Sequence, residues 1–242
     1  MSIVGMFYSS CGHESGRNMG KSATQPTKQN TGTVSPGSTS RGGGGRASPP
    51  ASTQRVLDGA TIFSRYGSAV FMIYTYDAVY QHQGSGFFIN DSGLAVSNYH
   101  VFEGTFVGAE KIKLQGSDEA YNVKEVIAKS EENDFILFRV EYPGQTNYIP
   151  IAPNKPSIGE KVYAIGSPMG LENTFSSGEV SQWRGDNLMQ ISVLIDHGSS
   201  GGALINEYGQ VVGITSGTFA DGSQANLNYA YSIDVVKPYL AE

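Results

Sequence analysis

The 242-residue sequence has a single cysteine, Cys11, and few charged side chains, which make up 16% of the residues. One cysteine cannot form a disulfide within the chain, so the fold must depend on the burial of apolar side chains. No apolar run reaches the roughly 18 residues that a membrane-spanning helix needs. The four histidines, His13, His82, His100 and His197, form no cluster with acidic residues at the spacing of metal ligands. We therefore expect no metal and no cofactor.

The net charge of −6 is unevenly distributed along the chain. Residues 1–54 hold five basic side chains against Glu14 alone, so the rest of the chain is more acidic than the whole. An acidic globular part argues against nucleic acid as a partner, because phosphate binding needs a basic surface.

Residues 12–54 are rich in Gly, Ser, Thr, Pro, Gln and Asn and have almost no large apolar side chains. Such a segment cannot bury enough surface to offset the entropy lost on ordering, so we expect residues 1–54 to be a disordered tether. The four glycines at 42–45 resemble a phosphate loop, but no strand precedes them and no Gly-Lys-Ser/Thr follows. We expect one globular domain over residues 55–242.

Residues 1–11 consist of a short apolar run, two serines and Cys11, which resembles the end of a bacterial lipoprotein signal without its basic start. Our hypothesis is that translation begins upstream and that Cys11 is the lipidated first residue of the mature protein. The chain would then lie in the bacterial cell envelope or periplasm, with a lipid anchor as its one link to a membrane. The alternative is an ordinary disordered N-terminus, and mass spectrometry of native material would distinguish the two.

From residue 58 onward, short runs of Val, Ile, Tyr and Phe alternate with clusters of Gly, Asn, Asp and Ser, which favours an all-β fold. A proline-punctuated connection over 150–156 could separate two halves, and a short helix over 233–240 could close the chain. The expected strands are 69–74, 85–89, 94–96, 121–128, 135–140, 161–165, 176–182, 189–195, 203–205, 211–215 and 228–233.

The segment Gly198-Ser199-Ser200-Gly201-Gly202 lies in a turn between two of these strands. Glycines let the backbone approach a substrate closely, and free N–H groups of such a turn can face a developing oxyanion. The alternative is a glycine-rich hairpin turn without chemistry. The same residues fit the Gly-x-Ser-x-Gly elbow of α/β-hydrolases, but there the histidine follows the serine, and none follows Ser200.

A serine hydroxyl needs a base, which is itself oriented by a third group. His100 is the best candidate for the base, because it follows an expected buried strand that would hold it rigidly; the alternative is a structural histidine. His197 is too close to Ser200 in the chain, and His82 looks like the tip of a loop. Asp134 directly precedes a buried apolar run, where a carboxylate is costly without a partner, so we expect it to orient the base. The order His, Asp, Ser is that of chymotrypsin-like peptidases.

Five blocks of sequence, spread over about residues 58–240, form a recognisable series: 84–89, 96–101, 133–137, 164–171 followed by 177–181, and 198–204. In this order they resemble the bacterial trypsin-like serine peptidases of the HtrA/Deg type. The resemblance implies two packed six-stranded antiparallel β-barrels, over about 58–150 and 156–240, with His100 and Asp134 in the first and Ser200 in the second. It further implies a serine endopeptidase that cleaves protein or peptide substrates through an acyl-enzyme, with Gly198 and Ser200 donating the oxyanion-hole N–H groups.

The sequence departs from relatives in two ways. Animal trypsins have an aspartate before the nucleophile that pairs with a newly cut N-terminus, whereas this chain has Ser199. We therefore expect no activation through that ion pair when the tether is removed. HtrA proteins usually carry a PDZ domain after the protease, and none follows in this sequence, so we expect the protease domain only and leave the oligomeric state open.

By alignment to the nucleophile motif, Leu194 and Ile195 would lie near the base of the primary specificity pocket, with Ile214, Thr215 and Ser216 as a wall. Because no carboxylate stands at that base, we expect a preference for small or medium apolar side chains rather than Lys or Arg. Two rival interpretations stay open at this point. One is a trypsin-fold module that binds peptides without cleaving them, and the other is a β-rich adhesion domain whose Gly-rich turn is incidental.

Overall fold

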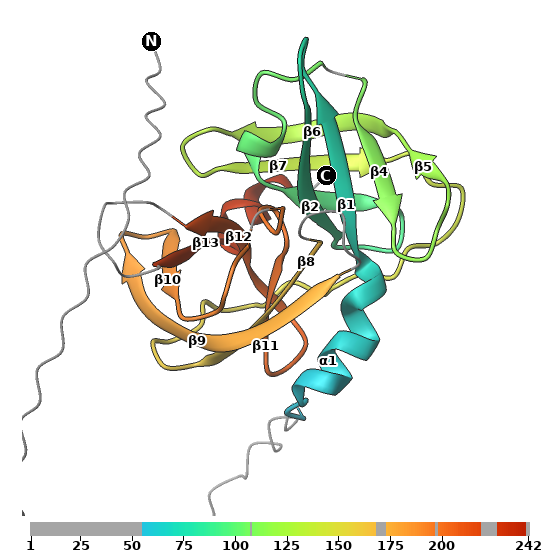
Figure 1. The fold of residues 1–242 in the computed structure, drawn as a ribbon. Coiled ribbons are helices and arrows are strands. Elements are labelled where there is room, and N and C mark those ends of the chain that lie inside the picture. Colours follow the sequence, from blue (N-terminus) through green and yellow to red (C-terminus); the bar gives the residue numbers. More distant parts are fainter. Residues whose placement is uncertain (1–54, 107, 168–172, 197, 219–226, 241–242) are drawn as a thin grey trace, which may run out of the picture. The chain divides into compact units, whose positions relative to one another are not determined.

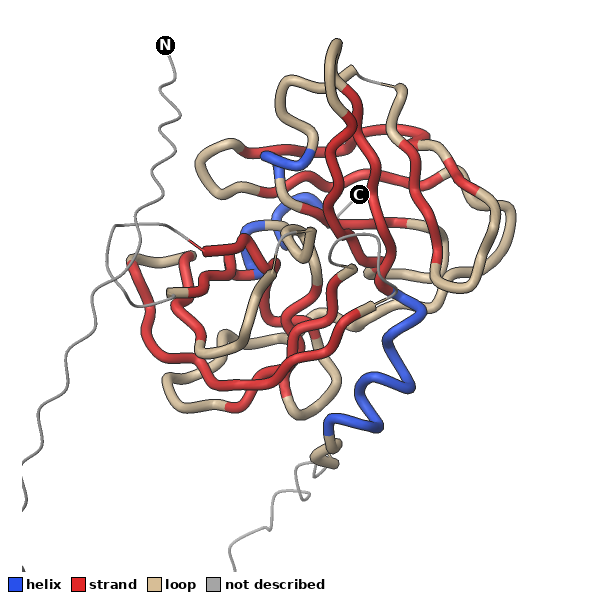
Figure 2. The backbone as a smooth tube through the Cα atoms, in the orientation of Figure 1, coloured by secondary structure: helices blue, strands red, loops and turns tan. Residues whose placement is uncertain are grey.

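The computed structural model describes residues 55–106, 108–167, 173–196, 198–218 and 227–240. In this part of the chain the regular structure is mostly β-strand, with one short α-helix and several 3₁₀ turns (Figure 2). The all-β class expected from the sequence is confirmed. The strands are β1 (Val70–Tyr76), β2 (Gln81–Phe88), β3 (Leu94–Ser97), β4 (Lys111–Leu114), β5 (Ala120–Tyr121), β6 (Val123–Ser130), β7 (Phe135–Val140), β8 (Lys161–Gly166), β9 (Thr174–Arg184), β10 (Leu188–Ile191), β11 (Ala203–Asn206), β12 (Val211–Thr218) and β13 (Asn228–Ser232).

The strands form two antiparallel sheets that follow one another along the chain (Figure 1). The second half is the expected closed barrel of six strands, in the order β10-β13-β12-β11-β8-β9. The first half differs from the expected closed barrel, because it is a curled sheet of seven strands in the order β5-β4-β1-β2-β3-β7-β6. Its two edge strands are poorly suited to close it: β5 has two residues, and the register of β6 with β7 is interrupted twice.

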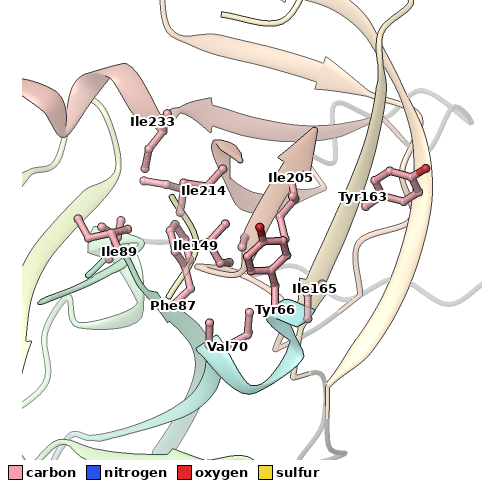
Figure 3. Packing of buried hydrophobic residues seen from close by; sticks show 14 of the residues in the cluster. Tyr66, Val70, Phe87, Ile89, Ile149, Tyr163, Ile165, Ile205, Ile214 and Ile233 are labelled. Atoms are coloured by element: carbon pink, nitrogen blue, oxygen red, sulfur yellow. The ribbon is translucent and has the colours of Figure 1, made fainter. Parts of the chain in front are cut away.

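Strands where the two halves meet are buried on both faces. In β7, Phe135 and Leu137 belong to a central cluster between the halves, whereas Ile136 and Phe138 belong to the core of the first half. In β11, Leu204 faces the interior of the second barrel while its neighbours face the central cluster. Figure 3 shows part of that cluster. Burial on both faces explains why these strands read as continuous apolar runs rather than alternating ones.

Helix α1 (Gly59–Tyr66) was not expected from the sequence. Asp58 caps its N-terminus, accepting a hydrogen bond from the Thr61 N–H at 2.7 Å, and its Ile62 and Tyr66 side chains are buried in the central cluster. Among the described residues, no helix has the length and apolar character to cross a membrane.

The C-terminal segment does not form the expected helix over 233–240. It makes two 3₁₀ turns, η4 (Ile233–Val235) and η5 (Lys237–Tyr239). Pro238 lies within the second turn and has no N–H to donate, which prevents a continuous α-helix here. The other 3₁₀ turns of the described chain are η1 (Gly67–Ala69) and η2 (Tyr99–Val101).

Candidate active site

His100 lies in the 3₁₀ turn η2, just after the buried strand β3. The turn is held by Val101, whose side chain is buried and whose carbonyl oxygen accepts a hydrogen bond from Thr75 Oγ1 at 2.9 Å. The His100 side chain itself is 42% exposed. A fixed backbone therefore presents an imidazole ring that a substrate can reach.

Asp134 directly precedes β7, and its carboxylate lies against this ring. The carboxylate oxygens are 2.9 and 3.0 Å from His100 Nδ1, and one of them also accepts the His100 backbone N–H at 3.0 Å. Asp134 has a φ of 42°, the one positive φ at a non-glycine residue within the described chain. Buried Asn98 donates from Nδ2 to the Asp134 carbonyl oxygen at 2.8 Å and supports this strained backbone. With the Nδ1 proton directed at the carboxylate, Nε2 is left as a proton acceptor.

A residue of the second half completes the contacts of this carboxylate. Ser216 in β12 donates from Oγ to Asp134 Oδ2 at 2.7 Å. The charge of Asp134 also reaches Tyr231, whose pKa is raised, mainly by burial and secondly by repulsion from the carboxylate. Donors from both halves therefore fix the orientation of Asp134.

Ser200 lies in the turn that leads into β11. Gly201 has a φ of 86°, and a Cβ at this position would come within 2.2 Å of the Ser85 carbonyl oxygen, so the turn requires glycine here. A Cβ on Gly202 would lie 2.6 Å from the Ile165 carbonyl oxygen. The glycines after Ser200 are thus needed for close packing against neighbouring backbone.

His100 and Ser200 line the same open cavity, which has a volume of about 650 Å³ and draws its walls from both halves. Gly198 lines it too, and the N–H groups of Gly198 and Ser200 donate to no backbone carbonyl in the part of the chain that the structure describes. Within the same residues, Ser200 Oγ makes no hydrogen bond to His100. Such bonds often tighten only when a substrate is bound. An oriented imidazole, a hydroxyl on the same cavity and two N–H groups without a backbone acceptor among the described residues form an arrangement suited to acyl transfer.

Comparison with known proteins shows the family to which the chain belongs. The family model of the trypsin-like peptidase domain matches residues 84–214, more than half of the chain. This chain belongs to the trypsin-like peptidase family. Curated relatives include a probable serine protease do-like of Buchnera aphidicola subsp. Acyrthosiphon pisum (34% identical over 170 residues), the periplasmic serine endoprotease DegP of Escherichia coli K12 (32% over 165 residues) and serine protease HTRA1 of Xenopus tropicalis (30% over 171 residues).

These relatives confirm that the peptidase is of the HtrA/Deg type. The matches cover 66%, 64% and 66% of this chain, but only 35%, 34% and 35% of those relatives, so the chain spans about a third of their length. The crystal structure of the serine endoprotease from Yersinia pestis superimposes with a TM-score of 0.66 at 24% identity, covering 75% of this chain and 65% of that one. The chymotrypsin-like fold expected from the sequence is thereby confirmed.

The five residues expected around the specificity pocket of the peptidase do not all lie together. Leu194, Ile195 and Ser216 line the cavity that contains Ser200. Thr215 lines a second cavity of about 320 Å³, which Leu194 and Ile195 also line. Ile214 does not fit the expectation: it is fully buried in the central cluster and lines neither cavity, because its side chain points to the face of β12 that packs between the halves.

Two residues that line the cavity were not expected there from the sequence. His82, expected at a loop tip, lies in β2, pairs with Asp77 at 2.7 Å and lines the active-site cavity. Asp196 lines both cavities, although no carboxylate was expected among the pocket residues. His197 and Cys11 lie outside the described residues. No group of three or more His, Cys, Asp or Glu side chains within the described chain could hold a metal ion.

Proposed function

We propose that this peptidase is a serine endopeptidase in which Ser200 is the nucleophile, His100 the general base and Asp134 the acid that orients the base. The pairing of His100 Nδ1 with the Asp134 carboxylate at 2.9 Å, on the wall of the cavity that Ser200 also lines, carries this proposal. The HtrA/Deg relatives support it, since they are named as serine proteases and endoproteases.

In the proposed reaction, Ser200 Oγ attacks the scissile carbonyl carbon while His100 Nε2 takes the hydroxyl proton. The carbonyl oxygen becomes an oxyanion, to which the N–H groups of Gly198 and Ser200 donate. His100 then gives its proton to the leaving amine, which leaves an ester on Ser200. Water attacks the carbonyl carbon of this acyl-enzyme while His100 takes its proton. The bond to Ser200 Oγ then breaks, the carboxylic acid product leaves, and His100 returns the proton to Ser200 Oγ.

For the substrate, we propose a protein or peptide with a small or medium apolar side chain before the scissile bond. Leu194 and Ile195 support this preference, because both line the cavity that contains Ser200. Digestion of a peptide library should show cleavage mainly after residues such as Ala, Val or Leu. Cleavage mainly after Arg or Lys would contradict the preference and point to Asp196, which lines the same cavity.

We further propose that residues 55–242 form the peptidase domain and that residues 1–54 tether it. A place in the bacterial cell envelope or periplasm is supported by the relatives that are named periplasmic. Lipidation of Cys11 stays a prediction from the sequence, and it has no support in the relatives. No further partner besides the substrate is proposed.

Labelling with a fluorophosphonate probe tests nucleophile and function together. The wild-type chain should be labelled and should degrade unfolded casein, whereas Ser200→Ala should lose both properties because it has no nucleophilic oxygen. Ser199→Ala is the matched control, since it removes the neighbouring hydroxyl and should still be labelled.

Two other outcomes would change the proposal. If Ser200→Ala keeps the label and Ser199→Ala loses it, the nucleophile is assigned wrongly. If the wild-type chain binds casein peptides but is neither labelled nor able to cleave them, the chain is a peptide-binding module with a trypsin fold.

A further inference from the structure

Hydrogen bonds to three of its own carbonyl oxygens hold the turn that carries Ser200 in place. The Gly198 oxygen accepts a hydrogen bond from Ser85 Oγ at 2.7 Å, and the Ser200 oxygen accepts one from the Ser85 N–H at 2.8 Å. The Ser199 oxygen accepts a bond from Thr215 Oγ1 at 2.7 Å. None of these three carbonyls can rotate into the active-site cavity without breaking a bond to a buried residue. The N–H groups of Ser199, Gly201 and Gly202 donate to backbone carbonyls. Within the described chain, those of Gly198 and Ser200 are therefore the ones that the turn can present to a substrate.

Ser85 makes two of these contacts from the other half of the molecule. It lies in β2, is fully buried and uses every polar atom it has. Its carbonyl oxygen accepts from Ser97 Oγ at 2.7 Å, and its own Oγ accepts from the Ser167 N–H at 2.8 Å. Because that N–H occupies the acceptor side of the hydroxyl, the hydroxyl proton is directed to the Gly198 oxygen.

Glycines on both sides of Ser85 make this approach possible. A Cβ on Gly84 would come within 2.6 Å of the Val101 side chain, and a Cβ on Gly86 within 2.6 Å of the Phe71 ring. The sequence Gly84-Ser85-Gly86 therefore brings one buried hydroxyl against the turn with no other side chain in the way.

We propose that Ser85 is a positioning residue for the oxyanion hole, an inference that rests on the function proposed above. Gly198 has a φ of 90°, and a glycine can leave this conformation at little steric cost. The bond from Ser85 Oγ fixes the peptide unit between Gly198 and Ser199, which carries the Gly198 carbonyl. The Gly198 N–H belongs to the preceding peptide unit, so its direction then depends on the φ of Gly198 alone. Without that bond, ψ of Gly198 can change as well, and the hole loses one donor.

Kinetics of Ser85→Ala test this role with a fluorogenic peptide taken from a cleavage site in β-casein. We expect kcat to fall by about tenfold to hundredfold while KM changes less than about threefold, because the oxyanion contact strengthens only in the transition state. A peptide aldehyde of the same sequence forms a tetrahedral adduct that needs the same N–H groups. Its inhibition constant should therefore weaken roughly in proportion to kcat.

Ser97→Ala is the matched control. It removes an equally buried seryl hydroxyl with the same 2.7 Å bond to a backbone carbonyl, but that carbonyl belongs to Ser85 and not to the turn. Its melting temperature should fall about as far as that of Ser85→Ala, while its kcat should stay within about threefold of wild type. Ser85→Cys keeps a weak hydrogen-bond donor of similar size, so its kcat should lie between those of the wild type and Ser85→Ala. If Ser85→Ala does not fold, Ser85→Cys takes its place in these comparisons.

Three results would overturn the inference: a wild-type kcat in Ser85→Ala, a loss confined to KM, or an equal loss of kcat in Ser97→Ala. Failure of the proposed function gives a different result, because the wild-type chain would then not be labelled at Ser200 at all.

Discussion

Asp134 joins the two halves of the molecule at the scale of a single side chain. Its carboxylate receives the ring and backbone N–H groups of His100 from the first half and the hydroxyl of Ser216 from the second. Its backbone has a positive φ, which is unfavourable for a residue with a Cβ, and it is supported by the bond from Asn98. One donor, Asn98, thus supports the strained backbone, while His100 and Ser216 orient the carboxylate.

Substitution of Asp134 by asparagine should lower kcat by a factor on the order of 10³ to 10⁴. An amide has one acceptor oxygen where the carboxylate has two, and its NH₂ group would face an acceptor nitrogen on His100. The ring would then hold its proton on Nε2, where it cannot accept the proton of Ser200. The measurement is kcat on the casein-derived peptide, with the melting temperature as a check on folding.

Ser216→Ala serves as the comparison, because both contacts between Asp134 and His100 remain. Its kcat should fall by less than about tenfold, the effect of one lost hydrogen bond to a charged group. If Asp134→Asn loses no more activity than Ser216→Ala, Asp134 is not the residue that sets the tautomer of His100.

At the scale of elements, the hairpin of β1 and β2 brings His82 to the wall of the active-site cavity. Asp77 organises its turn by accepting bonds from His82 and from the N–H groups of Val79 and Tyr80. These bonds, that of His82 foremost, lower the pKa of Asp77 to about 2. Because the folded pKa lies below the ordinary value of 3.8, the contribution to stability is present above about pH 4 and is lost as the pH falls toward 2.

A carboxyl NMR titration can check this arrangement. In His82→Gln, the pKa of Asp77 should rise toward 3.8 but stay below it, because the bonds from Val79 and Tyr80 remain. An unchanged pKa would show that the backbone donors alone account for the lowered value.

Several strands were predictable from the sequence. Where the prediction and the structure differ, the cause is local. Runs such as 135–140 and 203–205 were recognised because burial on both faces leaves them continuously apolar. Helix α1 was missed because two buried side chains in eight residues give little periodic signal. The strand expected over 189–195 ends at Ile191, and the strand expected from 85 begins at Gln81 with polar residues whose pairing partners lie in β1.

The candidate site, like the fold, was predictable only in part from the sequence. The pairing of His100 with Asp134 was predicted, because a serine nucleophile needs a base and an acid that orients it, and the order His, Asp, Ser is that of chymotrypsin-like peptidases. The contacts of Ser85 and Ser216 were not predictable from the residues alone. The bonds from Ser85 to the Gly198 oxygen, from the Ser167 N–H to Ser85 and from Ser216 to Asp134 join positions 82 or more residues apart in different halves. Nothing in the local sequence encodes that proximity.

At the scale of the whole molecule, the central apolar cluster holds the half with His100 and Asp134 against the half with Ser200. Strands β2, β3 and β7 contribute to it from one side, and β8, β11 and β12 from the other. Helix α1 adds Ile62 and Tyr66 to the same cluster, and Tyr66 packs against Gly209, where a Cβ would come within 2.6 Å of its hydroxyl oxygen. The N-terminal helix is thus part of the structure that brings the half with His100 and Asp134 against the half with Ser200.

Two truncations separate this helix from the segment before it. Removal of residues 1–54 should leave kcat/KM on the casein-derived peptide within about twofold, because it keeps every residue that the described chain contributes to the central cluster. A large gain in activity would contradict this, since uncharged Ser199 cannot pair with a new N-terminus as an aspartate would.

Removal of residues 1–66 also deletes Ile62 and Tyr66, which should destabilise the domain by at least about 3 kcal/mol in urea unfolding. If the longer truncation unfolds at the same urea concentration as the shorter one, the helix does not contribute to holding the two halves together.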